Sequence, residues 1–197
     1  GGSITVAAGD RITCTFTNTR RPQVKVVKAL VPTTHPGKFD FSIGAATFDN
    51  SGAGYGNSGN TSFQYVTIGS VTVGEAGHSG TSLSDYTSGL ACANASNALV
   101  TVGSNTGTSG SITVAAGDQI TCTFTNTRKP QIRLVKALVP ATDGGKFDLI
   151  IGGITPFDNA GSGYGNNGNT GFQNVSAGSV SISEAAHTGT TLLDYTS

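Results

Sequence analysis

An internal repeat constrains this chain of 197 residues more than any other feature. Residues 2–10 recur without a change at 110–118, and the match continues to Arg20 in the first copy and Arg128 in the second. The offset of 108 residues is too long for a solenoid unit and has the size of one small domain. The sequence therefore predicts an array of similar domains.

The sequence begins and ends within predicted domains and not at their boundaries. We interpret residues 1–20 as the closing strands of a preceding repeat and 21–128 as one complete repeat. Residues 129–197 then form the opening part of the next repeat, with one residue inserted before Pro156. Part of a longer array is the simplest interpretation.

The composition favours an all-β fold. Gly accounts for 29 residues, only 11% of residues are charged, and Thr, Ser, Val and Asn outnumber the good helix formers. The formal net charge of zero gives no reason to expect binding to nucleic acid or to an anionic membrane. No apolar run approaches the roughly 20 residues of a membrane-spanning helix.

Alternation with a period of two predicts short strands, and no segment requires a helix. Short strands at this spacing predict a β-sandwich or a small Greek-key barrel. A Gly- and Asn-rich stretch at 49–60 predicts a surface loop. The predicted strands are 23–30, 39–43, 63–67, 70–75, 83–87, 98–102, 111–114, 119–127 and 131–138.

Three polar residues fall on the apolar faces of these strands. Lys28 is in phase with Val24, Val26 and Leu30, and Lys136 has the same position in the second copy. The neighbouring position on the opposite face holds a lysine in one copy and an arginine in the other, as expected of a solvated cation.

A glutamate and an asparagine share this unusual placement. Glu75 is in phase with Val71 and Val73, and Glu184 is its equivalent in the next repeat. Asn126 is in phase with Ile120, Cys122 and Phe124 on the last strand, and Asn18 is its equivalent near the start of the chain. Burying such groups alone costs several kcal/mol, so we expect them to contact one another.

This triplet resembles the CnaB-type, prealbumin-like or SpaA-like repeat of bacterial surface adhesins and pilins. The matching motifs are Val26-Val27-Lys28-Ala29-Leu30, Val71-Thr72-Val73-Gly74-Glu75 and Thr123-Phe124-Thr125-Asn126-Thr127. The pattern departs from the family after Glu75, where residues 76–80 replace the usual Pro followed by Gly-Tyr. The resemblance implies tandem immunoglobulin-like or prealbumin-like β-sandwich domains.

The resemblance also implies a spontaneous isopeptide bond between Lys28 and Asn126, with Glu75 as the catalytic residue. Glu184 would have the same role in the next repeat, while Lys136 and Asn18 would pair with neighbouring repeats. Burial lowers the pKa of a lysine and raises that of a glutamate, which suits this reaction. An unreacted Lys–Glu pair with a hydrogen-bonded Asn satisfies the same pattern.

The three cysteines fit an oxidised extracellular domain. Cys92 and Cys122 can form a disulfide within 21–128, and the partner of Cys14 would lie outside this sequence. Such a bond implies an oxidising compartment. Buried free thiols are the alternative.

We expect no metal and no cofactor. The cysteines and histidines lack ligand spacing, and the three histidines lie in turn-like, solvated positions. No nucleophile elbow accompanies the Ser, His and Asp residues, so we expect no enzyme. The motifs at Tyr55-Gly56-Asn57 and Tyr164-Gly165-Asn166 are interpreted as exposed turns, with sugar-stacking tips as the alternative.

The sequence thus predicts a structural module of an extracellular stalk, fibre or filament on a bacterial surface. Its expected partners are neighbouring repeats of the same polypeptide and other fibre subunits. The alternative function is an adhesin that binds carbohydrate or host protein through the Gly/Asn-rich loops. One long polypeptide is the favoured arrangement; separate chains that complete one another, with Lys136 and Glu184 reacting in trans, are the other.

Overall fold

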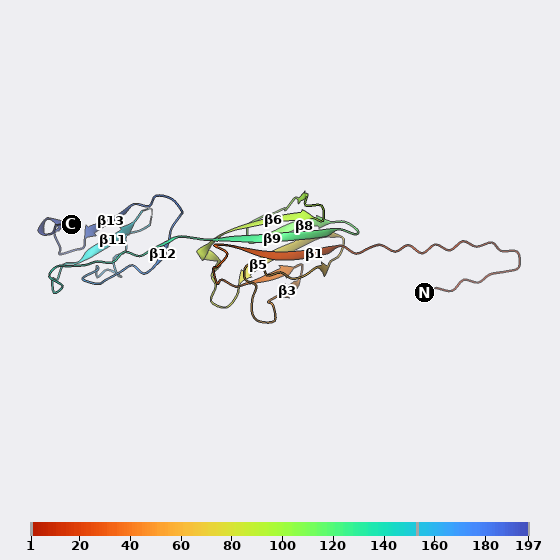
Figure 1. Ribbon diagram of the computed structural model, residues 1–197, viewed down its shortest axis with the longest axis horizontal. Helices are drawn as coiled ribbons and strands as arrows, with labels where there is room; N and C mark the ends of the chain where they lie inside the picture. Colours follow the sequence, from red (N-terminus) through yellow and green to blue (C-terminus); the bar gives the residue numbers. More distant parts are fainter. Residues whose placement is uncertain (1, 153, 197) are drawn as a thin grey trace.

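Strand β1 (Gln23–Val31) alternates buried and half-buried side chains, as a strand with one face on a core must. It belongs to a five-stranded sheet in the computed structural model, which describes residues 2–152 and 154–196 (Figure 1). The strand order is β4-β1-β9-β6-β7. The other members are β4 (Gln64–Tyr65), β6 (Tyr86–Asn94), β7 (Leu99–Val100) and β9 (Gln119–Arg128).

A four-stranded antiparallel sheet packs on the first and completes a sandwich, which we call the central sandwich (residues 23–128). Its order is β3-β2-β5-β8, with bounds Ala46–Phe48, Phe39–Ile43, Gly69–Gly77 and Ser109–Val114. The core lies between the sheets. Phe41 and Phe124 stack across it with ring centroids 6.0 Å apart. The central sandwich is therefore all-β, with its larger apolar cluster between the two sheets.

Strand β9 lies between β1 and β6, the first and sixth strands of the sandwich. It is parallel to β1, with Gln23 opposite Gln119 and Val31 opposite Thr127, and antiparallel to β6. Because β1 and β9 are parallel, the chain enters the sandwich at one end and leaves it at the other (Figure 1). This topology makes the first and last strands direct neighbours.

Residues 130–196, which we call the C-terminal segment, form two separate two-stranded sheets. β10 (Gln131–Ile132) pairs with β12 (Gln173–Asn174), and β11 (Phe147–Ile151) pairs with β13 (Ile182–Ala186). The strands β10 and β13 are shorter than their sequence equivalents β1 and β5. The Asn174 amide donates a hydrogen bond of 2.8 Å to Asp85 at the junction with the central sandwich.

The N-terminal segment, residues 2–20, contains no strand and is exposed along its length (Figure 1). Strands need partners for their backbone groups, and no sheet edge adjoins this segment. Its interpretation as the closing strands of a preceding repeat, like the domain boundaries at 20 and 128, remains a prediction.

The predicted strands agree with the structure best where alternation is long. The prediction of 39–43 is confirmed, and those of 23–30 and 119–127 each miss one terminal residue. The strand predicted at 83–87 is wrong at its start, because Leu83–Asp85 forms a 3-10 helix and β6 begins only at Tyr86. A second such helix spans Leu192–Asp194. Neither helix, nor any other in the described ranges, is long and apolar enough to cross a membrane.

Three further strand predictions correspond to much shorter elements. The predicted strand 131–138 is represented only by β10, the predicted strand 63–67 only by β4 and the predicted strand 98–102 only by β7. Alternation specifies which face a side chain occupies, but a strand forms only where a neighbouring strand accepts its backbone hydrogen bonds.

The loop at 49–60 is hydrogen-bonded to β1 and packs against the core. Asn57 Oδ1 accepts a hydrogen bond of 2.9 Å from the Leu30 backbone N–H. Tyr55 is 8% exposed and stacks on Phe41 with centroids 4.8 Å apart. The interpretation of Tyr55 as part of an exposed turn is therefore wrong, because its ring completes the core.

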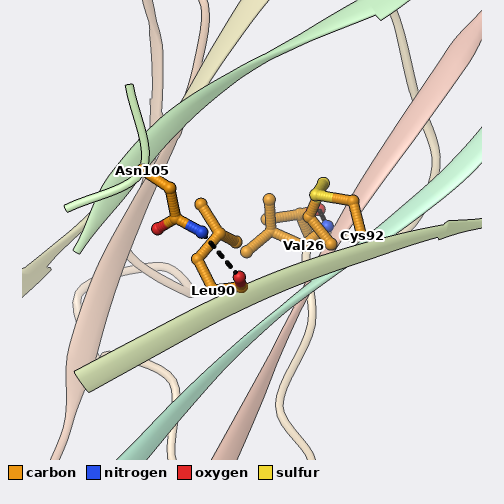
Figure 2. The surroundings of a disulfide bond; sticks show 6 residues. Val26, Leu90, Cys92 and Asn105 are labelled. Carbon is orange, nitrogen blue, oxygen red and sulfur yellow. Dashed lines mark hydrogen bonds between the residues drawn. A yellow bond between two sulfur atoms is a disulfide. The ribbon is translucent and has the colours of Figure 1, made fainter. Parts of the chain in front are cut away.

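A disulfide joins Cys92 of β6 to Cys122 of β9 at directly opposed positions. Both residues are buried, and Val26 and Leu90 lie close by (Figure 2). The Asn105 side-chain amide donates a hydrogen bond of 3.0 Å to the Leu90 carbonyl (Figure 2). Cys14, by contrast, is an exposed free thiol.

Replacing both Cys92 and Cys122 by alanine should lower the free energy of unfolding by about 3.5 kcal/mol. The disulfide closes a loop with a sequence separation of 30 residues, and the chain-entropy relation gives about this loss for a loop of that length. Urea unfolding followed by circular dichroism measures the change. Cys14→Ala is the matched control and should leave the transition unchanged; equal effects of both substitutions would contradict the assignment.

Candidate functional site

Lys28 lies in the core of the central sandwich, where only 1% of its surface is exposed. The alternation of β1 places it on the same face as Val24, Val26 and Leu30, as predicted. Its Nζ atom lies 4.1 Å from the centroid of the Phe39 ring. A lysine enclosed in this way needs a charged or hydrogen-bonding partner.

Glu75 supplies that partner from the opposite sheet. Its Oε2 atom lies 2.6 Å from Lys28 Nζ, and both side chains are fully buried. β5 presents Glu75 on the face that also carries Val71 and Val73. The two groups therefore meet across the interior, although 47 residues separate them in the sequence.

Asn126 completes the cluster on β9. It is 0% exposed, and its backbone is opposite Leu30 of β1 and Ser88 of β6. Lys28 lies two positions before Leu30 on the same face, so Asn126 and Lys28 are diagonal neighbours on adjacent strands. Within the described residues, neither Asn126 Nδ2 nor Asn126 Oδ1 has a hydrogen-bond partner, and Glu75 Oε1 has none either.

The electrostatics of the pair follow from burial. Loss of hydration lowers the pKa of Lys28 to about 8, although the adjacent Glu75 carboxylate opposes this change. Burial raises the pKa of Glu75, and the charge of the adjacent Lys28 opposes this change. Both shifts favour the neutral forms of the amine and the acid. A neutral amine is a nucleophile, and a neutral carboxylic acid can donate a proton.

Half of the same arrangement recurs in the C-terminal segment. Lys136 Nζ lies 2.7 Å from Glu184 Oε2 and 3.7 Å from the Phe147 ring centroid. These side chains are 12% and 29% exposed, whereas their equivalents in the central sandwich are fully buried. Asn18 lies in the exposed N-terminal segment of this chain, away from Lys136. The structure thus brings Lys28, Glu75 and Asn126 together, whereas in the second set it pairs Lys136 with Glu184 and leaves Asn18 apart.

Two residues near the site were missed by sequence reasoning. Phe39 covers the ammonium of Lys28, and Ser88 adjoins Glu75 from β6. Phe39 recurs in the second copy as Phe147, and this repetition was the one signal in the sequence; that each ring lies over a lysine is visible only in the structure. Ser88 carries no such signal, because it lies in a segment whose strand was predicted to end before it.

Comparison with known proteins shows which family the chain resembles. A SpaA family model described as a prealbumin-like fold domain matches residues 1–20 and 33–128, more than half of the chain. The chain belongs to the SpaA family of prealbumin-like fold domains. No curated protein and no solved structure matches it.

The SpaA family match includes Glu75, Asn126 and Asn18, but it does not reach Lys28. The position of the lysine therefore depends on the strand geometry described above. Prealbumin-like SpaA domains are structural rather than enzymatic, and they are pilus or surface modules.

The histidines of this SpaA-family chain are less solvated than predicted. His78 Nδ1 lies 2.9 Å from Asp40 Oδ1, and the equivalent pair His187–Asp148 is 2.8 Å apart. His35 contacts the hydroxyl of Tyr86 at 3.0 Å. These contacts tie loops to strands. No group of three metal-ligating side chains occurs among the described residues.

Asn126→Ala should yield a domain in which Lys28 remains free, and its stability should rise between pH 8 and pH 10. The folded pKa of Lys28 is about 8 and its ordinary value is 10.5, so the unfolded chain binds more protons in this range. The expected gain is on the order of 2 kcal/mol. Urea unfolding at successive pH values measures it.

The control for this titration is the same variant with Lys28→Met added. Without the amine, the unfolding free energy should stay flat over that range. A rise of equal size in both proteins would contradict the assignment of the titration to Lys28.

Proposed function

We propose that this protein is a load-bearing module of a bacterial extracellular stalk, fibre or filament, stabilised by an isopeptide bond between Lys28 and Asn126. One observation carries the proposal: a fully buried amide on the last strand has no hydrogen-bond partner among the described residues and lies beside a buried Lys–Glu pair. Leaving such an amide unpaired costs about 1–3 kcal/mol for each polar atom. A reaction that consumes the amide removes this cost.

The chemistry balances without a cofactor. Lys28 Nζ attacks Asn126 Cγ while protonated Glu75 donates a proton toward Oδ1. The new Nζ–Cγ bond forms, the Cγ–Nδ2 bond breaks, and Nδ2 leaves as ammonia after it takes up the proton lost by the amine. Fixed alignment of the groups in the core replaces the concentration that a bimolecular reaction would need. Because Glu75 serves one turnover per molecule, the reaction is maturation and not enzymatic catalysis.

The position of the bond gives it a mechanical role. β1 and β9 are parallel neighbours, so tension on the two ends of the central sandwich shears one strand against the other. A covalent link from Lys28 to Asn126 joins these two strands directly. Force would then pass through three residues of β9 and six of β1 at most, leaving the remainder of the sandwich unloaded.

The disulfide supports an extracellular setting. Cys92 and Cys122 link β6 to β9, the same strand that carries Asn126. Structural disulfides of this kind persist in oxidising compartments. Together the two bonds would join β1, β9 and β6 into one covalently connected sheet.

Serial modules are the proposed arrangement. The sequence repeat continues on both sides of the central sandwich, and the junction after β9 is short. Lys129 Nζ donates a hydrogen bond of 2.9 Å to the Ser84 carbonyl, and Arg128 forms an ion pair of 2.6 Å with Asp85. These contacts, with the Asn174–Asp85 hydrogen bond, favour a stiff connection between successive modules.

Adhesion through the Gly/Asn-rich loop receives less support. The Tyr55 ring that could stack on a sugar is buried against Phe41, and Asn57 is engaged with the backbone of β1. The loop is used to hold the first strand in place.

Single-molecule pulling on residues 23 and 128 tests the proposal. The wild-type protein should show no unfolding step for the central sandwich, because the Lys28–Asn126 bond carries the load. Lys28→Ala should unfold and lengthen by roughly 220 Å, since the chain outside the disulfide loop becomes free to extend.

Glu75→Gln, which keeps the side-chain volume, should behave like Lys28→Ala because it cannot supply the proton. Lys25→Ala, on the opposite face of β1, is the matched control and should behave like wild type. Full extension of the wild-type sandwich at forces that unfold Lys28→Ala would contradict the proposal.

A further inference from the structure

Residues 57–61, which we call the β1 brace, bond the backbone of Lys28 on the edge of β1 that faces away from β9. The Lys28 N–H donates a hydrogen bond of 2.8 Å to the Gly59 carbonyl. The Lys28 carbonyl accepts a hydrogen bond of 2.8 Å from the Ser58 N–H. The reactive lysine is therefore held by its backbone as well as by the contacts of its amine.

Two side chains of the β1 brace bond the residues on either side of Lys28. Thr61 Oγ1 accepts a hydrogen bond of 3.0 Å from the Val26 N–H, and Asn57 Oδ1 accepts one of 2.9 Å from the Leu30 N–H. A strand usually receives such bonds from the backbone of a neighbouring strand, which any residue type can supply. Here side-chain oxygens supply them, so the residue types at 57 and 61 matter.

The β1 brace is itself fixed to the core. Thr61 is 6% exposed, and its hydroxyl donates a hydrogen bond of 2.9 Å to the Ser62 carbonyl. Gly59 packs so closely on Tyr55 that an added Cβ atom would lie 3.2 Å from the tyrosine ring, and this ring stacks on Phe41. The brace therefore cannot shift along β1 without disturbing the core.

The same contacts surround the second lysine. The Lys136 N–H donates to the Gly168 carbonyl at 2.8 Å, and the Lys136 carbonyl accepts from the Asn167 N–H at 2.8 Å. Thr170 Oγ1 and Asn166 Oδ1 accept the flanking backbone N–H groups at 3.1 and 2.9 Å. Between the two copies of the brace only Ser58 and Asn167 differ, and this position contributes its backbone N–H to the lysine.

These contacts hold Lys136 where strand pairing does not. β10 covers only Gln131–Ile132 and, among the described residues, pairs with β12 alone. Lys136 Nζ nevertheless lies 2.7 Å from Glu184 Oε2. The brace, and not pairing with a strand such as β9, is thus the backbone contact that both lysines share.

We propose that Asn57 and Thr61 are positioning residues for the reaction between Lys28 and Asn126, an inference that rests on the proposed function. They fix β1 at residues 26 and 30, so that the amine is aligned for attack on Asn126 Cγ. The reaction itself is unchanged: the Nζ–Cγ bond forms, the Cγ–Nδ2 bond breaks, and ammonia leaves. A displacement of about 1 Å can slow a reaction between aligned groups on the order of a hundredfold.

A purely structural role for the brace is the competing explanation. A loop that covers a sheet edge protects its free backbone groups and stabilises the fold. Both roles predict a less stable domain when the bonds to β1 are removed. Only the positioning role predicts a slower reaction in chains that are fully folded.

The test measures the rate of ammonia loss in the full chain. Cell-free synthesis with a short isotopic pulse marks newly made chains, and intact mass under reducing conditions follows them with time, while circular dichroism checks folding. Thr61→Val and Asn57→Ala should each slow the loss on the order of ten- to a hundredfold. Thr61→Ser and Asn57→Asp keep an acceptor oxygen and should restore most of the rate.

Two controls separate positioning from stability. Asn60→Ala removes a brace side chain that accepts the Ser62 N–H at 3.0 Å, a bond outside β1. Ile112→Val removes a buried methylene group from β8 and destabilises the core away from the brace. Both variants should lose ammonia at the wild-type rate.

The outcomes separate this inference from the proposed function. Wild-type rates in Thr61→Val and Asn57→Ala would overturn the positioning role and leave the Lys28–Asn126 bond standing. Slowing of the same size in Ile112→Val would also overturn it, since stability alone would then explain the effect. A folded wild-type chain that never loses ammonia would overturn the proposed function and the positioning role together.

Discussion

Parallel pairing of the first and last strands is the constraint on which the rest of the structure depends. β9 is the last strand of the central sandwich in the sequence. It lies between β1 and β6, at the centre of its sheet. Every covalent feature considered above involves it. The disulfide reaches β6 from Cys122, and Asn126 lies beside β1 four residues later. The chain before β9 therefore cannot complete either the core or the site.

Burial of these three polar side chains lowers the stability of the fold unless the side chains react with one another. Lys28 and Glu75 are removed from water together, and a buried pair of this kind often contributes no net stability compared with apolar residues of similar volume. Asn126 adds an amide that has no hydrogen-bond partner in the part of the chain that the structure describes. Packing alone would favour apolar side chains at all three positions. The proposed Lys28–Asn126 bond would account for their presence, because the folded arrangement would then be the reactant of a bond-forming step.

The sequence specified the faces of the long strands well, because alternation over eight or more residues determines which side chains enter the core. Lys28 and Asn126, on two of these long strands, could thus be placed on the core face from the sequence, and the shorter predicted strand 70–75 placed Glu75 there as well. Strand ends could not be predicted at β6 and β10, since pairing with a neighbouring strand determines them. The burial of Tyr55 could not be predicted either, because a Gly/Asn-rich loop gives no local sign that one ring folds back onto Phe41. The strand that contains Phe39 was predicted, but the position of this ring over the lysine depends on the packing of the two sheets.

Intact mass of the folded chain, with the disulfide reduced, is the most direct measurement of the central claim. A deficit of one ammonia relative to the sequence, lost in Lys28→Ala and in Glu75→Gln, is the result that the account predicts for the central sandwich. The Lys28→Ala control also excludes loss of ammonia by cyclisation of an asparagine, which does not need the lysine. The full, unreacted mass in a folded wild-type sample would contradict the account. The sandwich would then be held by packing and by the Cys92–Cys122 disulfide alone.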